Sequence, residues 1–261
     1  MDSFWAFFIP AALAALSSPA GGAVSMLVRP SSLLLSIMSG LAGGVLLGAI
    51  GFEMVPSALD HANLVEVAVG FLLGVALVYA FDLFVNRGIM AGHKAEQHDQ
   101  MRRLQRRRGK RGDRVTVLAG ATSAEEVVEG LVIGISAAVG GGMGIIIATA
   151  IALDNISEAL SIGEMVWKGR DRKAKDKRIQ ILGWTGLIGL SLIASACVGW
   201  FTLRSLPADW IGFLTALGAG AIFYLAVTNL LIEAEENQFQ QSGGLAAAAG
   251  YIAMLLLTDV A

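Results

Sequence analysis

Eight apolar stretches, each long enough to cross a lipid bilayer, limit what this chain can fold into. They cover residues 4–27, 32–55, 64–85, 115–139, 143–166, 179–202, 210–232 and 243–260. A helix that crosses the hydrocarbon core needs about 20 mostly apolar residues. Because no water is present there, the backbone N–H and C=O groups must bond internally, as they do in a helix. The sequence therefore predicts an all-α, polytopic membrane protein with eight transmembrane helices, in which residues 1–261 form a single transmembrane domain.

The composition supports this class. Of the 261 residues, 55% are hydrophobic and only 15% are charged, whereas a soluble globular protein has about 25% charged residues. The mean hydropathy is +0.67. No basic residue precedes the first apolar stretch, so we interpret that stretch as a retained helix and not as a signal peptide. We expect the lipid bilayer to be the main partner of the protein.

The basic residues are very unevenly distributed. Ten of the 19 Lys and Arg residues lie in 86–114 and seven lie in 167–178, while Arg29 and Arg204 stand alone. With eight helices, all of them except Arg204 fall on one side of the membrane. The positive-inside rule makes that side cytoplasmic and puts both termini outside. We expect an integral protein of a bacterial inner (plasma) membrane.

Residues 86–114 form a long, strongly basic segment that is too poor in apolar residues to fold alone. We interpret it as a solvated cytoplasmic loop that lies near anionic lipid headgroups. The alternative is that His93 and His98 pass a metal ion along the loop. Binding of nucleic acid is not expected.

Three glutamates interrupt the fourth apolar stretch, at Glu125, Glu126 and Glu129. Each ionised acid at the centre of a membrane helix costs roughly 2.5–3.5 kcal/mol on insertion scales. These side chains must therefore face the bundle or a wet cavity, be protonated, or be paired. Glu125 and Glu129 are one helical turn apart and share a face, whereas Glu126 is rotated about 100° from Glu125.

The fifth stretch repeats this pattern with Asp154 and Glu158, again four residues apart, and with Asn155 beside the first. Neither span contains a Lys, Arg or His to neutralise the acids. A group of like charges requires cations or protons, and oxygen ligands suit a divalent metal ion. The alternative is that these acids are protonated packing groups with serine or carbonyl partners. The predicted metal-site residues are Glu125, Glu126, Glu129, Asp154, Asn155 and Glu158.

Both acidic segments resemble the metal-binding motifs of the ZIP family of divalent-metal transporters. "EEVVEGLVIG" resembles the family's helix 4 motif, His-Asn-x-x-Glu-Gly, and "DNISEALSIG" resembles its helix 5 motif, His-Asn-x-Pro-Glu-Gly. Helix 2 ("GGVLLGAIGFEMVPSAL") and helix 7 ("GAIFYLAVTNLLIEAEE") extend the resemblance over nearly the whole chain. It implies a ZIP-like bundle in which helices 1–3 and 6–8 form an inverted repeat around helices 4 and 5, as in other secondary transporters.

The resemblance assigns the glutamate that bridges metal sites in the family to Glu129, and the glutamate of the helix 5 motif to Glu158. Glu125 and Asp154 stand where the family has histidines. The chain also departs from the family at the motif proline and glycine, and its helix 6 has no acidic residue where some relatives supply a ligand. Glu53 in helix 2 and Asn229 in helix 7 stand where relatives often place a His and a Glu.

The predicted function is transport of divalent cations, with zinc, manganese or iron as the transported substrate and no organic cofactor. Loss of imidazole favours Mn²⁺ or Fe²⁺ over Zn²⁺ relative to a site that contains histidine. Two alternatives stay open: a proton- or sodium-linked carrier of another solute, and a relative that binds metal without transporting it. No enzymatic activity is expected. The oligomeric state is open, with a homodimer as one option.

Overall fold

The computed structural model describes residues 2–28, 30–85, 112–139, 142–168, 173–203, 208–236 and 240–258. Nearly all of these residues are helical, and none of them is in a strand, which confirms the all-α prediction. The helices are α1 (Asp2–Leu27), α2 (Ser32–Ala49), α3 (Val55–His61), α4 (Leu64–Val85), α6 (Gly112–Val139), α7 (Met143–Lys168), α8 (Ala174–Leu203), α9 (Ala208–Leu225), α10 (Leu231–Glu236) and α11 (Gln240–Thr258). Most of the basic loop, including His93 and His98, lies outside the described residues.

Seven helical stretches within the described residues are long and apolar enough to cross a membrane, as expected of an integral membrane protein. Two of these stretches combine several elements: α2 continues through a short π-helix into α3, and α9 does the same into α10. The exception among the long helices is α6, which has 28 residues but carries three glutamates within its apolar stretch. A helix of that length spans about 42 Å at 1.5 Å per residue, so its charge and not its length sets it apart.

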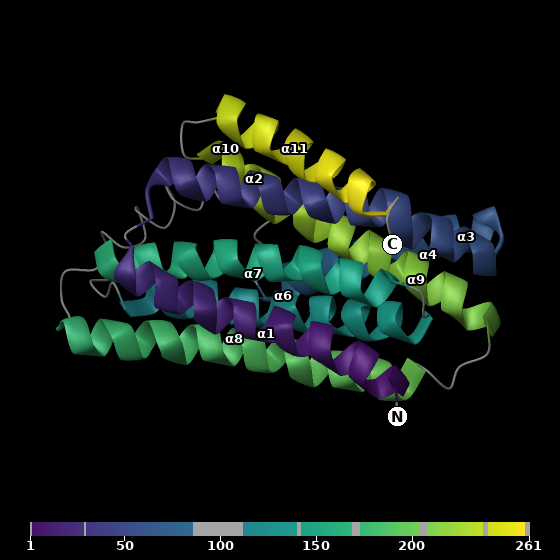
Figure 1. Ribbon diagram of the computed structural model, residues 1–261, viewed down its shortest axis with the longest axis horizontal. Coiled ribbons are helices and arrows are strands. Elements are labelled where there is room, and N and C mark those ends of the chain that lie inside the picture. The colour runs from purple at the N-terminus through teal and green to yellow at the C-terminus, as the bar shows by residue number, and fades with distance from the viewer. Residues whose placement is uncertain are drawn as a thin grey trace.

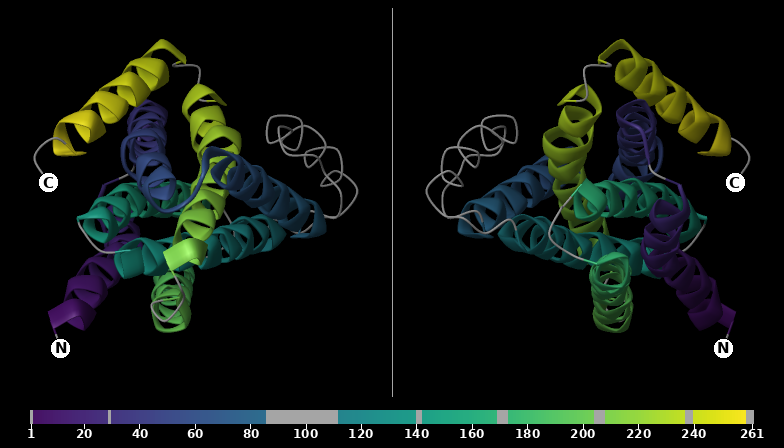
Figure 2. Two further views of the ribbon diagram at one scale, coloured as in Figure 1. Left: turned by 90° about the vertical axis from the view of Figure 1, so that its right-hand side faces the viewer. Right: turned by 90° about the vertical axis from the view of Figure 1, so that its left-hand side faces the viewer.

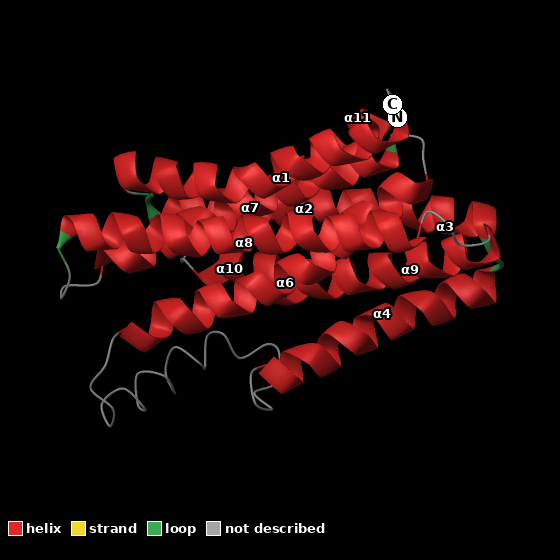
Figure 3. Ribbon diagram, turned by 90° about the horizontal axis from the view of Figure 1, so that it is seen from below, coloured by secondary structure: helices red, strands yellow, loops and turns green. Residues whose placement is uncertain are grey.

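The long helices run roughly parallel to one axis of the molecule and alternate in direction (Figure 1). The N- and C-terminal ends of the chain lie at the same end of the bundle, which Figure 3 shows from another side. At the opposite end lie the last turns of α1 and α7 and the first turns of α2 and α8. Lys168 ends α7 at this end of the bundle, and Lys175 and Lys177 stand in the first turn of α8.

The two acidic helices, α6 and α7, lie side by side in the middle of the bundle (Figure 2). The most extensive packing partners of α6 and α7 are α8 and α1 respectively, while α2 packs on α11 and α4 packs on α9. Glycine permits this close packing. A side chain at Gly44 would collide with the backbone carbonyl of Ala247 in α11, and one at Gly74 would collide with that of Leu217 in α9. Small residues at helix contacts are what membrane proteins use in place of a hydrophobic driving force.

Local sequence explains where individual helices begin. Before α4, Asn63 accepts hydrogen bonds through Oδ1 from the backbone N–H groups of Val65 and Glu66, each at 3.0 Å. The Glu66 carboxylate in turn accepts a hydrogen bond from the backbone N–H of Asn63 at 3.3 Å. This reciprocal arrangement is a capping box, which satisfies N–H groups that have no partner inside the helix. At α2, the Ser31 hydroxyl accepts from the Leu34 N–H at 3.2 Å and has the same effect.

The two helices that begin with α2 and α9 are each interrupted by one π-helical segment, which follows 18 residues of α-helix. The first, η1 (Ile50–Met54), joins α2 to α3, and the second, η2 (Ala226–Leu230), joins α9 to α10. Each segment is followed by a backbone hydrogen bond that spans five residues, from the Val55 N–H to the Ile50 carbonyl and from the Leu231 N–H to the Ala226 carbonyl. Such segments contain one more residue per turn than an α-helix and occur frequently at functional sites.

Candidate metal centre

The predicted site residues lie about halfway along α6 and α7, which are in contact. Three of the acids are almost completely buried: Glu126 is 1% exposed, and Glu129 and Asp154 are 4% exposed. Asn155 is fully buried, whereas Glu125 and Glu158 are only partly buried. Ionisable side chains are rarely buried to this extent unless they are paired, so their partners matter.

Two contacts join the acidic helices directly. The carboxyl groups of Glu129 in α6 and Asp154 in α7 lie close enough to interact with each other. Since an ionised carboxylate can only accept a hydrogen bond, a hydrogen bond between these two groups requires a proton on one of them. The side chain of Asn155 in α7 lies close enough to the Glu126 carboxyl group in α6 to interact with it. The predicted apposition of the two acidic motifs is therefore present in these two pairs.

Each of the four buried residues in these pairs keeps one oxygen without a partner. These atoms are Oε2 of Glu126, Oε2 of Glu129, Oδ1 of Asp154 and Oδ1 of Asn155. Every carboxylate oxygen that is buried and unpartnered within the described residues belongs to this group. Leaving a buried acceptor unsatisfied costs roughly 1–3 kcal/mol, and more for a charged group. Four such oxygens in one region would be satisfied by a bound cation, to which oxygen atoms donate lone pairs.

The charges around the pairs are negative. Glu126 lies close enough to Asp154 and Glu158 to be repelled by them when all are ionised, and Asp154 is repelled in the same way by Glu233 of α10. No Lys, Arg or His occurs between residues 115 and 167. Protein cations that could neutralise the group are therefore absent from the whole of α7 before its last residue, Lys168, and from α6 after its first turn.

Hydrogen bonds to neighbouring helices hold the backbone around the site. The Asn155 amide donates to the backbone carbonyl of Ala14 in α1 at 3.1 Å. The Ser195 hydroxyl of α8 donates to the backbone carbonyl of Glu126 at 3.2 Å. The hydroxyls of Ser39 in α2 and Ser157 in α7 are hydrogen-bonded at 2.8 Å. These contacts fix the site relative to α1, α2 and α8.

Glu125 connects the site to η2, the π segment between α9 and α10. The Asn229 side chain, in η2, donates a hydrogen bond from Nδ2 to Oε1 of Glu125, and the distance is 2.7 Å. The sequence marks Asn229 as a polar residue in an apolar stretch, but it does not indicate this contact. The other polar residue singled out in this way, Glu53, lies partly buried in η1.

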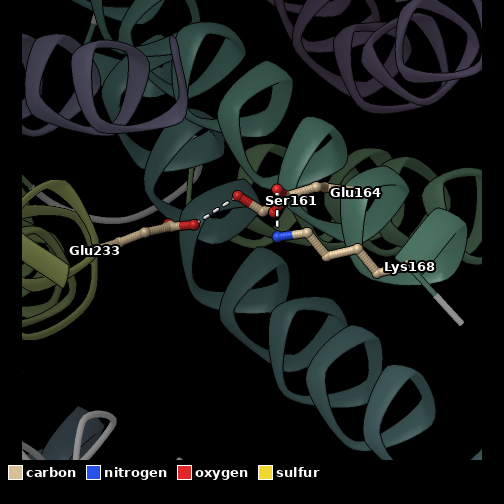
Figure 4. Close-up of polar contacts among 4 residues, drawn as sticks. All are labelled: Ser161, Glu164, Lys168 and Glu233. Atoms are coloured by element: carbon tan, nitrogen blue, oxygen red, sulfur yellow. Dashed lines mark hydrogen bonds and ion pairs between the residues drawn. The ribbon is translucent and has the colours of Figure 1, made fainter. Parts of the chain in front are cut away.

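A second polar contact, between α7 and α10, was not predicted. The Ser161 hydroxyl donates to Oε1 of Glu233 at 2.5 Å (Figure 4). One turn further along α7, Glu164 forms an ion pair with Lys168, with 2.6 Å between Oε1 and Nζ (Figure 4). Asp154, Glu158 and Ser161 follow one another at helical spacing, so polar groups extend from the middle of α7 toward its C-terminal end. The i, i+4 spacing of Glu164 and Lys168 was the one available signal in the sequence.

The acids are not preassembled as a metal site. Within the described residues, no three Asp, Glu, His or Cys side chains are arranged so that they could hold one metal ion. The six predicted metal-site residues therefore stay a prediction. Glu125 and Glu158 are the partly buried members. In this arrangement the carboxyl groups of Glu129 and Asp154 are close enough to share a proton, and the group contains buried oxygen atoms that lack a hydrogen-bond partner.

Comparison with known proteins adds no family assignment: neither the protein-family models nor the curated proteins contain a match to this chain.

Proposed function

We propose that this protein transports divalent metal cations across a membrane and that it is a divergent member of the ZIP family. The observation that supports this function best is the group of buried, unpartnered oxygens on Glu126, Glu129, Asp154 and Asn155. They lie halfway along helices that contain no neighbouring cationic side chain. Intramembrane acids of this kind characteristically mark ion pathways.

Electrostatics explains why we expect the bound ion to be a divalent cation. Several carboxylates in one low-dielectric region cannot all ionise unless positive charge is nearby. A proton shared between Glu129 and Asp154 relieves only part of this repulsion. A divalent ion would neutralise two carboxylates and satisfy the free oxygens at the same time. Transport requires binding that is favourable but reversible, and a site that is only partly assembled suits that requirement.

The ligand chemistry favours a hard or borderline ion. All six predicted ligands donate oxygen, because the family's histidine positions are occupied by Glu125 and Asp154. Carboxylate and amide oxygens suit Mn²⁺, and Fe²⁺ shares this preference more than Zn²⁺ does. Zn²⁺ also accepts carboxylate ligands. We therefore propose Mn²⁺ or Fe²⁺ as the preferred substrate and Zn²⁺ as a competing one.

We further propose that α6 is an eighth transmembrane helix and that the bundle is an inverted repeat. The contacts of the helices support this. In such a repeat α1 corresponds to α8, α2 to α9, α4 to α11, and α6 to α7. The contact between α1 and α7 then corresponds to the contact between α8 and α6, and the contact between α4 and α9 corresponds to the contact between α11 and α2. All four are among the most extensive contacts, and the two π segments occupy equivalent positions, in helices 2 and 7. The buried glutamates of α6 face the bundle and not lipid, which removes the objection to its crossing.

In this proposal the metal enters from the side of the chain termini and leaves toward the basic loops. The positive-inside rule makes the basic side cytoplasmic, so the direction is uptake. The arriving ion displaces the proton held between Glu129 and Asp154, because both compete for the same oxygens. The polar groups that follow Asp154 along α7 would conduct the ion toward the cytoplasmic end.

Replacement of Glu129 by Gln provides the direct test. Glu129→Gln keeps the size of the side chain and removes its charge, and it should lower Mn²⁺ uptake into proteoliposomes by at least about 100-fold, since even outer-shell partners of a metal cost 10–100-fold. The matched control is Glu66→Gln, the same chemical change in an exposed residue at the start of α4, which should transport normally.

Other outcomes would point to the other classes of function. Normal Mn²⁺, Fe²⁺ and Zn²⁺ uptake by Glu129→Gln would contradict the proposal. Metal binding without uptake in the unmodified protein would indicate a protein that binds metal but does not transport it. Proton or Na⁺ flux that does not depend on metal, and that is lost in Glu129→Gln, would indicate a carrier of another solute.

A further inference from the structure

Asn229 is delivered to the acidic site by a non-standard helical segment. It is the fourth residue of η2, and its amide contacts Glu125 of α6 from across the α6–α9 interface. Glu125 is itself adjacent to the buried Glu126 and one turn before Glu129. Outer-shell groups of this kind orient ligand carboxylates, because a hydrogen bond to one oxygen sets the direction of the other.

The conformation of η2 determines whether this contact exists. A π segment holds one extra residue between two stretches of α-helix, and that residue can be accommodated at different positions along the helix. If the extra residue is accommodated on the other side of a given residue, the side chain of that residue rotates by about 100° around the helix axis. Such a rotation would carry the Asn229 amide away from Glu125. The flanking helices α9 and α10 would keep their own packing contacts.

We infer that Asn229 is a positioning residue for Glu125 and that η2 is a two-state element that makes and breaks this contact during transport. The inference rests on the proposed function, since it describes how the metal site is coupled to a rearrangement of η2, between α9 and α10. Local rearrangements of this size at element junctions are a common basis of switching in proteins. The state described by the structure is the one in which the contact is made.

The role of Asn229 is tested by Mn²⁺ binding to the purified protein. Asn229→Leu keeps the approximate size and removes the donor, and it should weaken Mn²⁺ binding by about tenfold. Thr228→Val is the matched control, because it removes a polar group from the same segment, where the Thr228 hydroxyl donates only to the Tyr224 carbonyl in its own helix. This control should bind Mn²⁺ as the unmodified protein does.

A double-mutant cycle separates positioning from a general structural role. If Asn229 acts through Glu125, Asn229→Leu should have no further effect in a protein that already carries Glu125→Ala. An equal tenfold loss in that background would overturn the assignment, because it would show that Asn229 acts on something else. Unchanged binding in Asn229→Leu alone would overturn it as well.

The two-state role of η2 is tested by removing its extra residue. Deletion of the exposed Val227 allows the segment to close as an α-helix, and it should reproduce the loss seen in Asn229→Leu without adding to it. Hydrogen exchange on the unmodified protein supplies a measurement that does not depend on folding of this variant. Mn²⁺ should change the exchange of residues 226–231 more than that of the preceding part of α9, and an equal or absent change would overturn the two-state role.

These results distinguish the inference from the proposed function. If Glu129→Gln abolishes Mn²⁺ binding while Asn229→Leu and the Val227 deletion leave it unchanged, the metal site stands and the inference fails. If Glu129→Gln binds Mn²⁺ normally, the proposed function fails first.

Discussion

The two halves of α7 treat their acidic residues in opposite ways. Near the end of the helix, Glu164 is paired with Lys168, a residue that is 73% exposed. In the middle, Asp154 is 4% exposed, has a carboxyl group as its side-chain partner and keeps a free oxygen. The acid near the exposed end of α7 is therefore paired with a cation, although such a pair contributes little to stability. The buried acid in the middle of α7 has no cationic partner on this helix, although burying an unpaired charge costs most there. This pattern is the one expected of the proposed site for a visiting cation.

The largest expected difference between the two halves concerns metal affinity. Asp154→Asn should weaken Mn²⁺ binding by at least about 100-fold, since the variant loses a ligand charge and not merely an outer-shell partner. Glu164→Gln should leave the dissociation constant within about twofold, because its charge is already neutralised at the surface. Isothermal titration of both variants measures this difference, and equal losses would remove the distinction between the two halves.

A pH series tests the proton that the middle of the helix holds. Metal binding should release that proton, so the affinity for Mn²⁺ should rise with pH, by up to about tenfold per pH unit while one proton is displaced. Binding isotherms between pH 5 and 8 provide the measurement. An affinity that is independent of pH would show that the proton and the ion do not share oxygens.

Stability without metal should respond in the opposite direction from affinity. Asp154→Asn supplies a permanent amide donor to Glu129, so that the pair no longer needs to bind a proton, and it should raise the free energy of unfolding of the metal-free protein by about 1 kcal/mol, as replacements in strained functional sites often do. Thermal unfolding in detergent without metal and with chelator measures the change. A clear loss of stability would mean that Asp154 serves mainly to pack the helices.

The smallest effect is expected at the surface. Lys168→Met should lower the free energy of unfolding by no more than about 0.5 kcal/mol, because exposed i, i+4 ion pairs contribute little and salt screens them. The same thermal unfolding, repeated at high salt, should show the difference between Lys168→Met and the unmodified protein disappear. A larger loss would indicate that the end of α7 is more tightly held than its exposure suggests.

Much of the site was predictable, because it depends on helical periodicity. The spacing of Glu125, Glu126 and Glu129, and the matching spacing in helix 5, indicate which side chains share a face. The glycine-rich character of the segments indicates that the helices pack closely. The structure places Glu129 near Asp154 and Glu126 near Asn155, and their role in a metal site stays a prediction. The convergence of all six residues on one ion did not appear in the structure and stays a prediction.

The contacts of η2 and α10 could not be predicted from helical periodicity. Asn229 and Glu125 are 104 positions apart in the sequence, and Ser161 and Glu233 are 72 apart. No periodicity within one helix indicates which face of another helix it will meet. The π segments are also invisible to a search for period 3.6, since a single extra residue changes the register locally and leaves the apolar character of the stretch unchanged.

The order of the amino acids by itself determined that this chain forms long apolar helices, that its basic residues gather in a few connecting segments, and that two neighbouring helices carry acids at matched spacing. These properties follow from local rules: hydrophobic length, charge and the helical repeat. Only the tertiary structure decided which helices touch, that Asn229 reaches Glu125, and which carboxylate oxygens are left without partners. Which helices touch depends on the close approach that glycines such as Gly44 and Gly74 permit, and close approach is a property of helix pairs and not of any single segment.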